Sequence, residues 1–571
     1  MVVLDVLSEK IKARVAVLGI ESIDINWEHP ADLSNGDYST NIALIASKKV
    51  GKNPKEVAQE IVDSIKSDLP KEIDRVEVAG AGFINIYLSH QFFIQSIDHI
   101  FNDQNFGKTD TLSGKKVIIE YTDPNPFKEF HIGHLMSNTI GETLSRIIEW
   151  NGAEIKRACY QGDVGLHVAK AIFGMIENKD SLPSEEAPIE VWAKFLGSCY
   201  ALGSKLEGDT EEDKNTIKDF NKKIYDRSDS EINRFYDLGR AKSLEYFEEI
   251  YKKLGTKFDF YFFESKTGEF GKDIVLSNIE NGVFENGENG AIVFKGEKYN
   301  PKLHTRVFIN SQGLPTYEAK ELGLSKIKFD TYGYDESILV TGNEINDYFR
   351  VLLEAMNQVF PDLAKKTKHI SHGMLRLPTG KMSSRTGDVV TGDSLLSDIG
   401  EKVAEKMKES NRAEDKNLVN DIAVSALKYS VLKQATGRDI IFDFDKSLSF
   451  EGDSGPYLSY SHARARSIIE KAKTASIEIS AESPTESIFE IERLLYRFPE
   501  VVAMAYKEYA PHAIASYLVE LARSFNSFYA ETQIVDDTDK TSGYKVMITS
   551  AFATIQKNGL YILGIKAPEK M

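Results

Sequence analysis

Apolar positions along the chain follow two periods, and the changes from one to the other mark out three regions. In the first, apolar residues recur at helical spacing over 53–69, behind a capping asparagine at Asn53 and a proline in the first turn. Two runs that alternate between apolar and polar residues follow, at 75–78 and 83–88, with glycines between them. These patterns predict a helix and a strand pair, and therefore an N-terminal α+β module over residues 1–110.

The second region alternates strand, helix and strand. A β-branched run at 117–121 is followed by a one-sided apolar stripe that ends at Gly152, and 155–160 has the pattern of the next strand. Two strands joined by a helix in this way form a β-α-β unit with parallel strands. The pattern predicts a parallel α/β sheet domain over residues 111–400.

Residues 176–300 interrupt this alternation. They are acidic and helical in pattern, with turn residues at 208–213, and we interpret them as an insertion in the sheet domain. The sheet pattern is expected to resume at 306–309 and to continue through 338–340 into a helix around 348–359.

From residue 417 onward the pattern is helical, which predicts an all-α bundle over residues 415–571. Apolar residues recur at helical spacing in four segments: 427–432, 460–469, 491–498 and 517–529. No internal repeat is evident in the sequence, so we expect three regions of different type rather than a repeated unit.

The composition is that of an ordinary globular protein, with 42% hydrophobic and 27% charged residues. No apolar run is long enough to span a bilayer, and the first residues lack the pattern of a signal peptide. The two cysteines, Cys159 and Cys199, offer neither a disulfide framework nor a cysteine-rich zinc site. We therefore expect a cytoplasmic protein with no membrane association and no zinc.

The formal net charge is -17, which taken alone argues against nucleic acid as a partner. Net charge is a weak guide to this property, because binding requires only a local basic face. The charge therefore leaves the class of partner open.

A strand, a loop and a helix start meet at residues 123–134, the arrangement at which α/β proteins bind phosphate. His131 and His134 lie three residues apart at the expected start of the helix, with Gly133 between them. The histidines supply hydrogen-bonding groups, and the glycine allows a nucleotide to approach the backbone closely. A pair of metal ligands is the alternative, but no third ligand with matching spacing stands nearby, so we expect no metal site.

A second basic and flexible segment, Gly380-Lys381-Met382-Ser383-Ser384-Arg385, lies far downstream. Lys381 alone would be an ordinary solvated lysine, and Asn125 between two prolines an ordinary turn residue. The specific signal is the occurrence of both segments, in this order, on a β-α-β framework.

The two segments resemble the signatures of class I aminoacyl-tRNA synthetases: His131-Ile132-Gly133-His134 matches the first signature, and Lys381-Met382-Ser383-Ser384-Arg385 matches the second. The run 123–126 and Lys128 resemble the arginine enzymes in particular. Six further segments resemble that family: 36–41, 82–85, 160–165, 443–449, 452–464 and 559–571. The resemblance implies a Rossmann-type α/β catalytic domain between an N-terminal α+β module that contacts tRNA and a C-terminal all-α anticodon-binding bundle.

The resemblance also implies a reaction, the ATP-dependent ligation of L-arginine to tRNA(Arg) through an arginyl-adenylate. Attack on the α-phosphate places negative charge on phosphate oxygens, so catalysis depends on positioning and electrostatics. Catalysis is expected from His131, His134, Lys381 and Lys128, and ATP binding from His131, Gly133, His134, Lys381, Met382 and Ser383. Mg²⁺ is expected to neutralise the pyrophosphate, although no dedicated ligand set is visible in the sequence.

One departure from the usual second signature concerns its second lysine, which is Ser384 in this chain. Arginine enzymes commonly lack that lysine and carry one just before the first histidine instead. Lys128 stands at that place, and we assign it the compensating role, against the plainer interpretation of a surface lysine.

Arginine is planar and always charged, so a selective pocket should present carboxylates to it. The resemblance implies four arginine-binding residues: Glu120, Asn125, Tyr317 and Glu321. Many relatives have aspartate where Glu321 stands, and Val351 replaces a glutamine found in some of them. Asn346 and Asp347 are therefore the alternative partners of the guanidinium group.

For tRNA, the resemblance points to aromatic rings interleaved with cations and amides, which suit unstacked bases. The expected tRNA-binding residues are Asn85, Tyr87, Tyr460, Arg464, Tyr517 and Asn526. Aromatic residues at helical spacing are more often part of a core than a platform for RNA.

Three other classes of protein share part of this pattern. Another class I synthetase of the same subgroup lacks the arginine-type ends of the chain, and a noncatalytic tRNA-binding relative would not require His131, His134 and Lys381. Another nucleotidyltransferase of the same sheet fold would not need the helical end region. The family is often monomeric, and we expect a monomer here.

Overall fold

The computed structural model describes residues 2–20, 22–206, 210–376, 391–408, 415–482 and 484–571. At its centre lies a five-stranded sheet in which every neighbouring pair is parallel. The strands lie in the order β11 (Thr367–His372), β10 (Glu336–Gly342), β4 (Lys116–Glu120), β5 (Glu154–Gln161) and β6 (Phe260–Phe263). The chain runs from β4 outward to β6 and then returns to the other side of β4. The strand order therefore reverses between β4 and β10, which is where open α/β sheets bind ligands.

The predicted β-α-β unit is confirmed: β4 and β5 are parallel and joined by α5 (Ile132–Trp150). Two other sheet predictions are wrong. The strand at 306–309 is part of β9 (Thr305–Ile309), which belongs to a separate antiparallel sheet with β7 (Glu285–Asn286) and β8 (Ile292–Lys295). Conversely, β6 lies inside the range 176–300 that was predicted to be an insertion, yet it is a strand of the central sheet.

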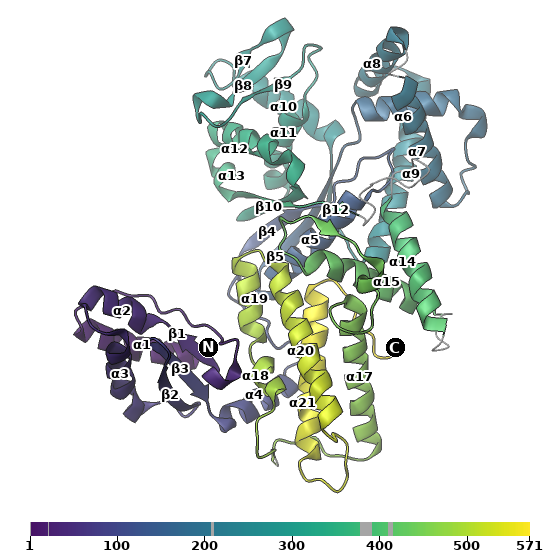
Figure 1. Cartoon of the computed structure of the whole chain (residues 1–571). Coiled ribbons are helices and arrows are strands. Elements are labelled where there is room, and N and C mark those ends of the chain that lie inside the picture. The colour runs from purple at the N-terminus through teal and green to yellow at the C-terminus, as the bar shows by residue number, and fades with distance from the viewer. Residues whose placement is uncertain (1, 21, 207–209, 377–390, 409–414, 483) are drawn as a thin grey trace.

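Two lobes rise from the carboxyl ends of the central strands, as Figure 1 shows. One is the all-helical lobe, composed of α6 (Leu166–Glu177), α7 (Ile189–Leu206), α8 (Glu211–Asp226) and α9 (Ser230–Leu254). The other contains the small sheet with α10 (Glu264–Ser277), α11 (Tyr317–Thr331), α12 (Asn346–Val359) and α13 (Pro361–Lys366). Each lobe has its own buried apolar cluster, so each is a packed unit and not a loop.

The N-terminal module is an antiparallel sheet of order β1-β3-β2 covered by helices, as the alternating runs predicted. Its strands are β1 (Tyr38–Thr40), β2 (Ile73–Ala79) and β3 (Phe83–Leu88). Its helices are α1 (Val2–Val17), α2 (Ile42–Val50) and α3 (Pro54–Ile65), and the side chain of Asn53 caps α3 at the amide of Lys55. From there α4 (His90–Asn102) leads to the central domain.

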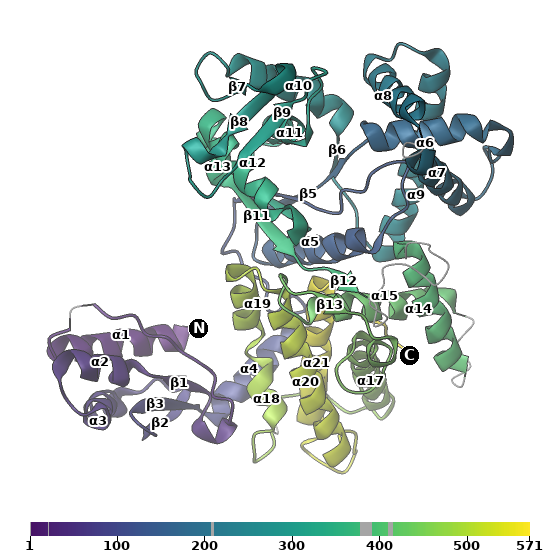
Figure 2. The same cartoon turned by 45° about the horizontal axis from the view of Figure 1, so that its top comes forward.

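The last part of the described chain is helical, as predicted. It contains α14 (Gly392–Met407), α15 (Lys416–Leu432), α16 (Phe444–Ser447), α17 (Gly455–Thr474), α18 (Glu490–Leu495), α19 (Phe498–Lys507), α20 (Pro511–Glu531) and α21 (Ser542–Ile562). A short parallel pair, β12 (Leu375–Arg376) and β13 (Ile440–Ile441), accompanies them. Figure 2 shows α5 between the sheet and these helices, and its side chains share one apolar core with them.

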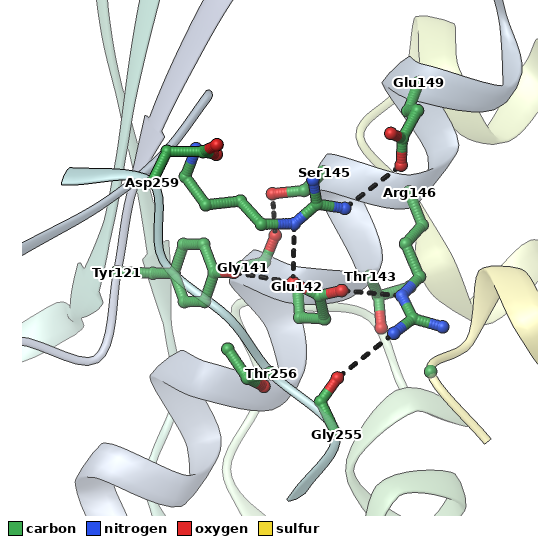
Figure 3. Close-up of polar contacts among 12 residues, drawn as sticks. Tyr121, Gly141, Glu142, Thr143, Ser145, Arg146, Glu149, Gly255, Thr256 and Asp259 are labelled. Atoms are coloured by element: carbon green, nitrogen blue, oxygen red, sulfur yellow. Dashed lines mark hydrogen bonds and ion pairs between the residues drawn. The ribbon is translucent and has the colours of Figure 1, made fainter. Parts of the chain in front are cut away.

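A buried polar cluster holds α5 in this position (Figure 3). Glu142, at the middle of the helix, accepts hydrogen bonds from Tyr121 at 2.6 Å, Arg146 at 2.6 Å and Arg157 at 2.9 Å. Burial opposes ionisation of Glu142, but Arg146 and Arg157 outweigh it and lower the pKa of this carboxyl group. Arg146 also donates to the carbonyl of Tyr561 at 2.7 Å. The cluster thus ties α5 to the sheet and to α21.

None of the described helices has a stretch long and apolar enough to cross a bilayer.

Candidate active site

A cavity of about 560 Å³ lies at the reversal point of the sheet, between the carboxyl ends of β4 and β10. Its walls come from the loop after β4, the start of α5, and α11 and α12 of the lobe that contains the small sheet. Seven of the residues predicted for ATP and arginine line it: Glu120, Asn125, His131, Gly133, His134, Tyr317 and Glu321. The fold therefore brings together residues that lie up to 201 positions apart, from Glu120 to Glu321.

The loop after β4 has an unusual backbone, because Thr122, Asp123 and Phe127 all have positive φ angles, of 81°, 45° and 67°. Such conformations are strained for residues with side chains and persist only when neighbours hold them. Here Thr122 donates its amide to Ser137 Oγ at 2.9 Å, and Asp123 accepts from the amide of Tyr160 at 2.7 Å. Hydrogen bonds to α5 and β5 thus fix the loop in the shape that forms the floor of the cavity.

The two signature histidines form the N-terminus of α5, as predicted. Their rings stack with a centroid distance of 3.5 Å. Nδ1 of His131 accepts from the amide of Gly133, and Nδ1 of His134 accepts from the amide of His131, each at 3.2 Å. A Cβ on residue 133 would lie 3.0 Å from the ring of His131, so a side chain there would push against this ring.

The histidines are neutral at physiological pH. Burial, followed by the nearby Lys128, lowers the pKa of His131, and burial followed by His131 lowers the pKa of His134 well below its ordinary value. Since Nδ1 of each ring accepts a backbone hydrogen bond, the proton of the neutral ring resides on Nε2. Each ring therefore supplies an N–H donor at a helix N-terminus, where the helix dipole also favours anions.

The opposite part of the cavity is acidic. Six carboxylates line it, Glu120, Asp123, Glu264, Glu318, Glu321 and Glu344, whereas Arg306 is the one arginine or lysine among the described lining residues. Arg306 in turn pairs with Glu318 at 2.9 Å. An excess of negative charge in an enclosed site favours a ligand with positive charge at more than one point.

Two buried lysines lie directly behind this acidic wall. Lys328 Nζ is 2.7 Å from Glu120, and Lys320 Nζ is 2.5 Å from Glu264, with all four side chains at most 5% exposed. Burial opposes the charge of both lysines, but Glu120 and Glu264 outweigh it and raise the pKa of Lys328 and Lys320 respectively. Lys328 and Lys320 thus hold the side chains of Glu120 and Glu264 in place, and neither lysine is among the described residues that line the cavity. Burial nevertheless raises the pKa of Glu264, because Lys320 offsets only part of its effect.

Within the part of the chain that the structure describes, Glu321 and Asp123 form no ion pair with a lysine, although the charge of Lys328 acts on both. Burial, followed by the charge of Glu120, raises the pKa of both carboxyl groups well above their ordinary values. An incoming cation would relieve this repulsion, because its charge favours the ionised form of each carboxyl group. The acidic wall is therefore poised to bind a guanidinium or ammonium group.

Lys128 lies outside the set of residues that line the cavity. Its ammonium group is 4.6 Å from the centre of the Tyr200 ring, on α7 of the all-helical lobe. It nevertheless lowers the pKa of both signature histidines, which places its charge at the rim of the site. Lys381, Met382 and Ser383, together with Ser384 and Arg385, lie outside the described residues.

The alternative guanidinium partners are not part of the cavity. Asp347 is exposed and pairs with Arg350 at 3.2 Å, and neither Asn346 nor Asp347 is among the described residues that line the cavity. Glu321, by contrast, faces it. The geometry thus favours Glu321 over Asp347.

The predicted tRNA-binding residues fall into an exposed group and a buried group. Arg464 lies over the rings of Tyr460 and Tyr529 at 4.8 and 5.2 Å, and Tyr460 is 36% exposed. Asn526 is half-buried and bonds to the guanidinium group of Arg464. This cluster presents rings and a cation at the surface of the bundle.

Tyr517 is not exposed, as a residue that stacks with bases would be. Its side chain belongs to a residue that is 6% exposed, and its hydroxyl group donates to the carbonyl of Leu494 at 3.1 Å. Asn85 is 3% exposed and accepts from Ser39 at 2.8 Å. Tyr517 lies on the buried face of α20, and Asn85 is itself buried within β3. Both residues therefore pack inside the protein and are not exposed for stacking with bases. Tyr87 is half-buried and lies under the guanidinium group of Arg75 at 3.6 Å.

Sequence reasoning missed Glu264, Lys320 and Lys328. Glu264 directly follows β6, and the carboxyl end of a parallel strand is a place to look for site residues once the strand is recognised. Lys328 shares a face of α11 with Glu321 at a spacing of seven, which the helical period would have indicated. No local signal connects Lys328 with Glu120, since only the sheet and helix packing brings them together.

Comparisons with known proteins agree with this geometry. Three protein-family models match the chain. The family model "tRNA synthetases class I (R), catalytic domain" matches residues 96–444. The family model "DALR anticodon binding domain" matches 458–571, and "Arginyl tRNA synthetase N terminal domain" matches 4–88. The solved structure of Thermus thermophilus arginyl-tRNA synthetase has a TM-score of 0.79 and 23% identity over 99% of this chain and 100% of that chain, so it has the same fold.

Two curated relatives are named arginine–tRNA ligase. The protein of Borreliella afzelii is 31% identical over 570 residues, or 97% of this chain and 95% of the relative. That of Fusobacterium nucleatum is 31% identical over 550 residues, or 94% and 93%. The parallel sheet and the cavity at its reversal point, with the matched catalytic model, define a class I tRNA synthetase. Within that class, the chain belongs to the arginyl-tRNA synthetase family.

Proposed function

We propose that the protein ligates L-arginine to tRNA(Arg) in two steps, with both steps centred on the cavity at the reversal point of the sheet. One observation carries the proposal: a single cavity joins a six-carboxylate wall to a helix N-terminus that bears two neutral histidines. The first suits a substrate with two positive groups, and the second suits the phosphates of ATP.

In the first step, the carboxylate of arginine attacks the α-phosphate of ATP, and pyrophosphate leaves. Negative charge grows on the phosphate oxygens as this happens. The Nε2–H groups of His131 and His134 are assigned to donate to these oxygens, with Lys128 and Lys381 as the cationic groups. Gly133 leaves space for the nucleotide beside the backbone. In the second step, a hydroxyl group of the terminal ribose of tRNA attacks the carbonyl carbon of the adenylate, an ester bond forms, the bond to the phosphate breaks, and AMP leaves.

Arginine recognition is assigned to the acidic wall. Glu321, with Tyr317 at the mouth of the cavity, is assigned to the guanidinium group, and Glu120 and Asn125 to the ammonium and carboxylate end. A planar guanidinium group can form paired hydrogen bonds to a carboxylate, which a lysine ammonium group cannot match. This chemistry supports selection of arginine over other cationic amino acids.

Mg²⁺ would accompany ATP and neutralise the pyrophosphate charge. In the described part of the chain there is no group of three or more His, Cys, Asp or Glu side chains arranged to hold a metal ion. The ion would therefore be held largely by phosphate oxygens and water, as Mg²⁺ commonly is in nucleotide sites. No step of the mechanism here depends on a protein ligand to it.

The tRNA is assigned to the two ends of the chain, residues 1–110 and the bundle from 415 to 571, with residues 111–400 as the catalytic domain. In the bundle, Arg464 between Tyr460 and Tyr529 can stack with unpaired bases, since aromatic rings and guanidinium planes are common platforms for them. In the N-terminal module, the stacked pair of Arg75 and Tyr87 is the corresponding feature. We assign the protein to the cytoplasm as a monomer, in keeping with its role in translation.

The decisive test is ATP–pyrophosphate exchange with each of the twenty amino acids, in the presence and absence of tRNA(Arg). Arginine should support exchange, with lysine and citrulline at background, and tRNA should stimulate it. Exchange with a different amino acid would overturn the assignment of the acidic wall to arginine. Exchange with arginine that does not lead to arginyl-tRNA would overturn the second step.

A further inference from the structure

The all-helical lobe, α6 to α9, has no role in the chemistry described so far. Figure 1 shows it as a separate unit, apart from the lobe that contains the small sheet, and in chain order it lies between β5 and β6. Among its contacts with the catalytic domain are several to a short segment, residues 127–129, that directly precedes the histidine signature. This segment carries Lys128.

One side of the segment is held by α9. Phe127 is fully buried with a φ angle of 67°, and its amide donates to Ser243 Oγ at 2.9 Å. Gly239, one turn earlier on the same face of α9, lies directly under the Phe127 ring, where any side chain would overlap the ring. A strained backbone conformation of this kind persists only when its surroundings hold it. Ser243 and Gly239 provide those surroundings.

The other side is held by α7. Gly197 lies against Glu129, since a Cβ there would be 3.0 Å from Cγ of the glutamate. Tyr200, three residues further and therefore on the same face of the helix, places its ring 4.6 Å from Nζ of Lys128. Burial, the largest influence, would raise the pKa of the Tyr200 hydroxyl, but Lys128 together with Ser204 and Lys170 lowers the pKa overall.

From these contacts we infer that the all-helical lobe fixes the conformation of the segment 127–129. Within the lobe, Tyr200 is a positioning residue that orients the ammonium group of Lys128 toward the phosphate end of the cavity. The inference rests on the proposed function, because it deepens the role assigned there to Lys128. A lysine side chain has four rotatable bonds, so an ammonium group that must meet a phosphate gains from being confined beforehand. The tyrosine ring confines it through a cation–π contact and excludes water on one side.

The test measures arginine-dependent ATP–pyrophosphate exchange in the presence of tRNA(Arg). Three variants are each made twice, once in the protein that retains Lys128 and once in the protein that carries Lys128→Ala. Tyr200→Leu removes the ring, Tyr200→Phe keeps it, and Phe195→Leu is the matched control. Phe195 also lies on α7 but packs against Trp192, at a centroid distance of 6.1 Å.

With Lys128 present, Tyr200→Leu should lower kcat about fivefold to tenfold, since a cation–π contact contributes ~1 kcal/mol and each 1.4 kcal/mol is a factor of ten. Tyr200→Phe and Phe195→Leu should remain within about twofold of the natural protein, and KM for arginine should not change. With Lys128→Ala, Tyr200→Leu should add no further loss. Equal losses from Tyr200→Leu in both backgrounds, or a loss that appears only in KM for arginine, would overturn the inference.

A second measurement does not depend on activity. In protein labelled with 3-fluorotyrosine, the ¹⁹F resonance that disappears in Tyr200→Phe belongs to Tyr200, and its titration reports the contact with Lys128. Lys128→Ala should move this titration to higher pH, and an unchanged titration contradicts the inference whether or not the exchange assay succeeds. Absence of arginine-dependent exchange in the natural protein would instead refute the proposed function, and the ¹⁹F result would still decide the contact.

Discussion

The two ends of the cavity are built in different ways. The end proposed to bind the nucleotide, called the nucleotide end below, comes from one continuous segment, because the loop after β4 and the first turn of α5 supply His131, Gly133 and His134 within four residues. The end proposed to bind arginine, called the arginine end below, combines Glu120, Glu264 and Glu321, which come from the end of β4, the start of α10 and the first half of α11. The first needs a local backbone shape, whereas the second needs three elements packed in the right places.

The electrostatics differ in the same way. At the nucleotide end, burial keeps the histidine rings neutral, so they donate hydrogen bonds without adding net charge. At the arginine end, buried lysines form ion pairs with two of the carboxylates. A phosphate site can therefore be formed by backbone N–H groups and a helix dipole. A site for a cation needs buried carboxylates, and these need nearby positive charges in the protein before the ligand binds.

The largest effect should come from removing one of those countercharges. Lys328→Met leaves Glu120 buried without its ammonium partner, and breaking a buried pair in this way costs about 3–5 kcal/mol of unfolding free energy. Urea unfolding followed by tryptophan fluorescence measures the loss. Lys326→Met on the same helix is the control, since its pair with Asp330 is at the surface and contributes ~1 kcal/mol or less. Equal losses from the two variants would mean that the buried pair does not organise the arginine end.

The next effect concerns the nucleotide end. Lys128→Ala removes a charge close to the signature histidines, and loss of one group that stabilises transition-state charge lowers rates by about 10²- to 10³-fold. Arginine-dependent ATP–pyrophosphate exchange measures this, with an unchanged melting temperature as the check on folding. Arg385→Ala, in the second signature, should cost less. Small and similar losses in both variants would remove Lys128 from the catalytic set.

A smaller effect is expected from Glu321→Gln, which keeps the shape of the side chain and removes its charge. A hydrogen bond to a charged group contributes about 1.5–3 kcal/mol, so KM for arginine should rise about 10- to 150-fold while KM for ATP stays unchanged. Asp347→Asn is the matched control and should have no effect, because Asp347 pairs with Arg350 at the surface. The reverse result would assign the guanidinium group to Asp347.

The smallest effect concerns His167, whose ring nitrogen Nε2 lies 2.8 Å from the carbonyl of Gly162. Burial first, and then Lys128, lower the pKa of His167 to about 3, whereas an unfolded histidine titrates near 6.5. Between these values the unfolded chain binds one more proton, so stability is complete above about pH 6.5 and falls by about 1.4 kcal/mol per pH unit below it. His167→Gln should make this decline shallower by that amount, as measured by urea unfolding at pH 7 and pH 5.5. An identical decline in the variant would contradict a neutral, buried His167.

Most of the elements could be predicted from the sequence, because their cause is local. The cap at Asn53, the alternation in β3 and the apolar stripe of α5 each act over a few residues. The errors arose where a local pattern does not say which sheet a strand joins. The run at 306–309 was expected to continue the central sheet but pairs antiparallel with β8, and the four residues of β6 were too short to stand out within a helical region.

The sequence by itself determined the class of protein and indicated the end of the site that we assign to the nucleotide, since the positions of His131, Gly133, His134 and the turn before them follow from backbone geometry that neighbouring residues dictate. Only the tertiary structure decided how the arginine end works. The pairing of Lys328 with Glu120 spans 208 positions, and that of Lys320 with Glu264 spans 56. The burial that raises the pKa of Glu321 likewise exists only after β4, α10 and α11 have packed. The physical reason is that burial and countercharge are properties of the folded surroundings, whereas a helix cap and a phosphate loop are properties of the local chain.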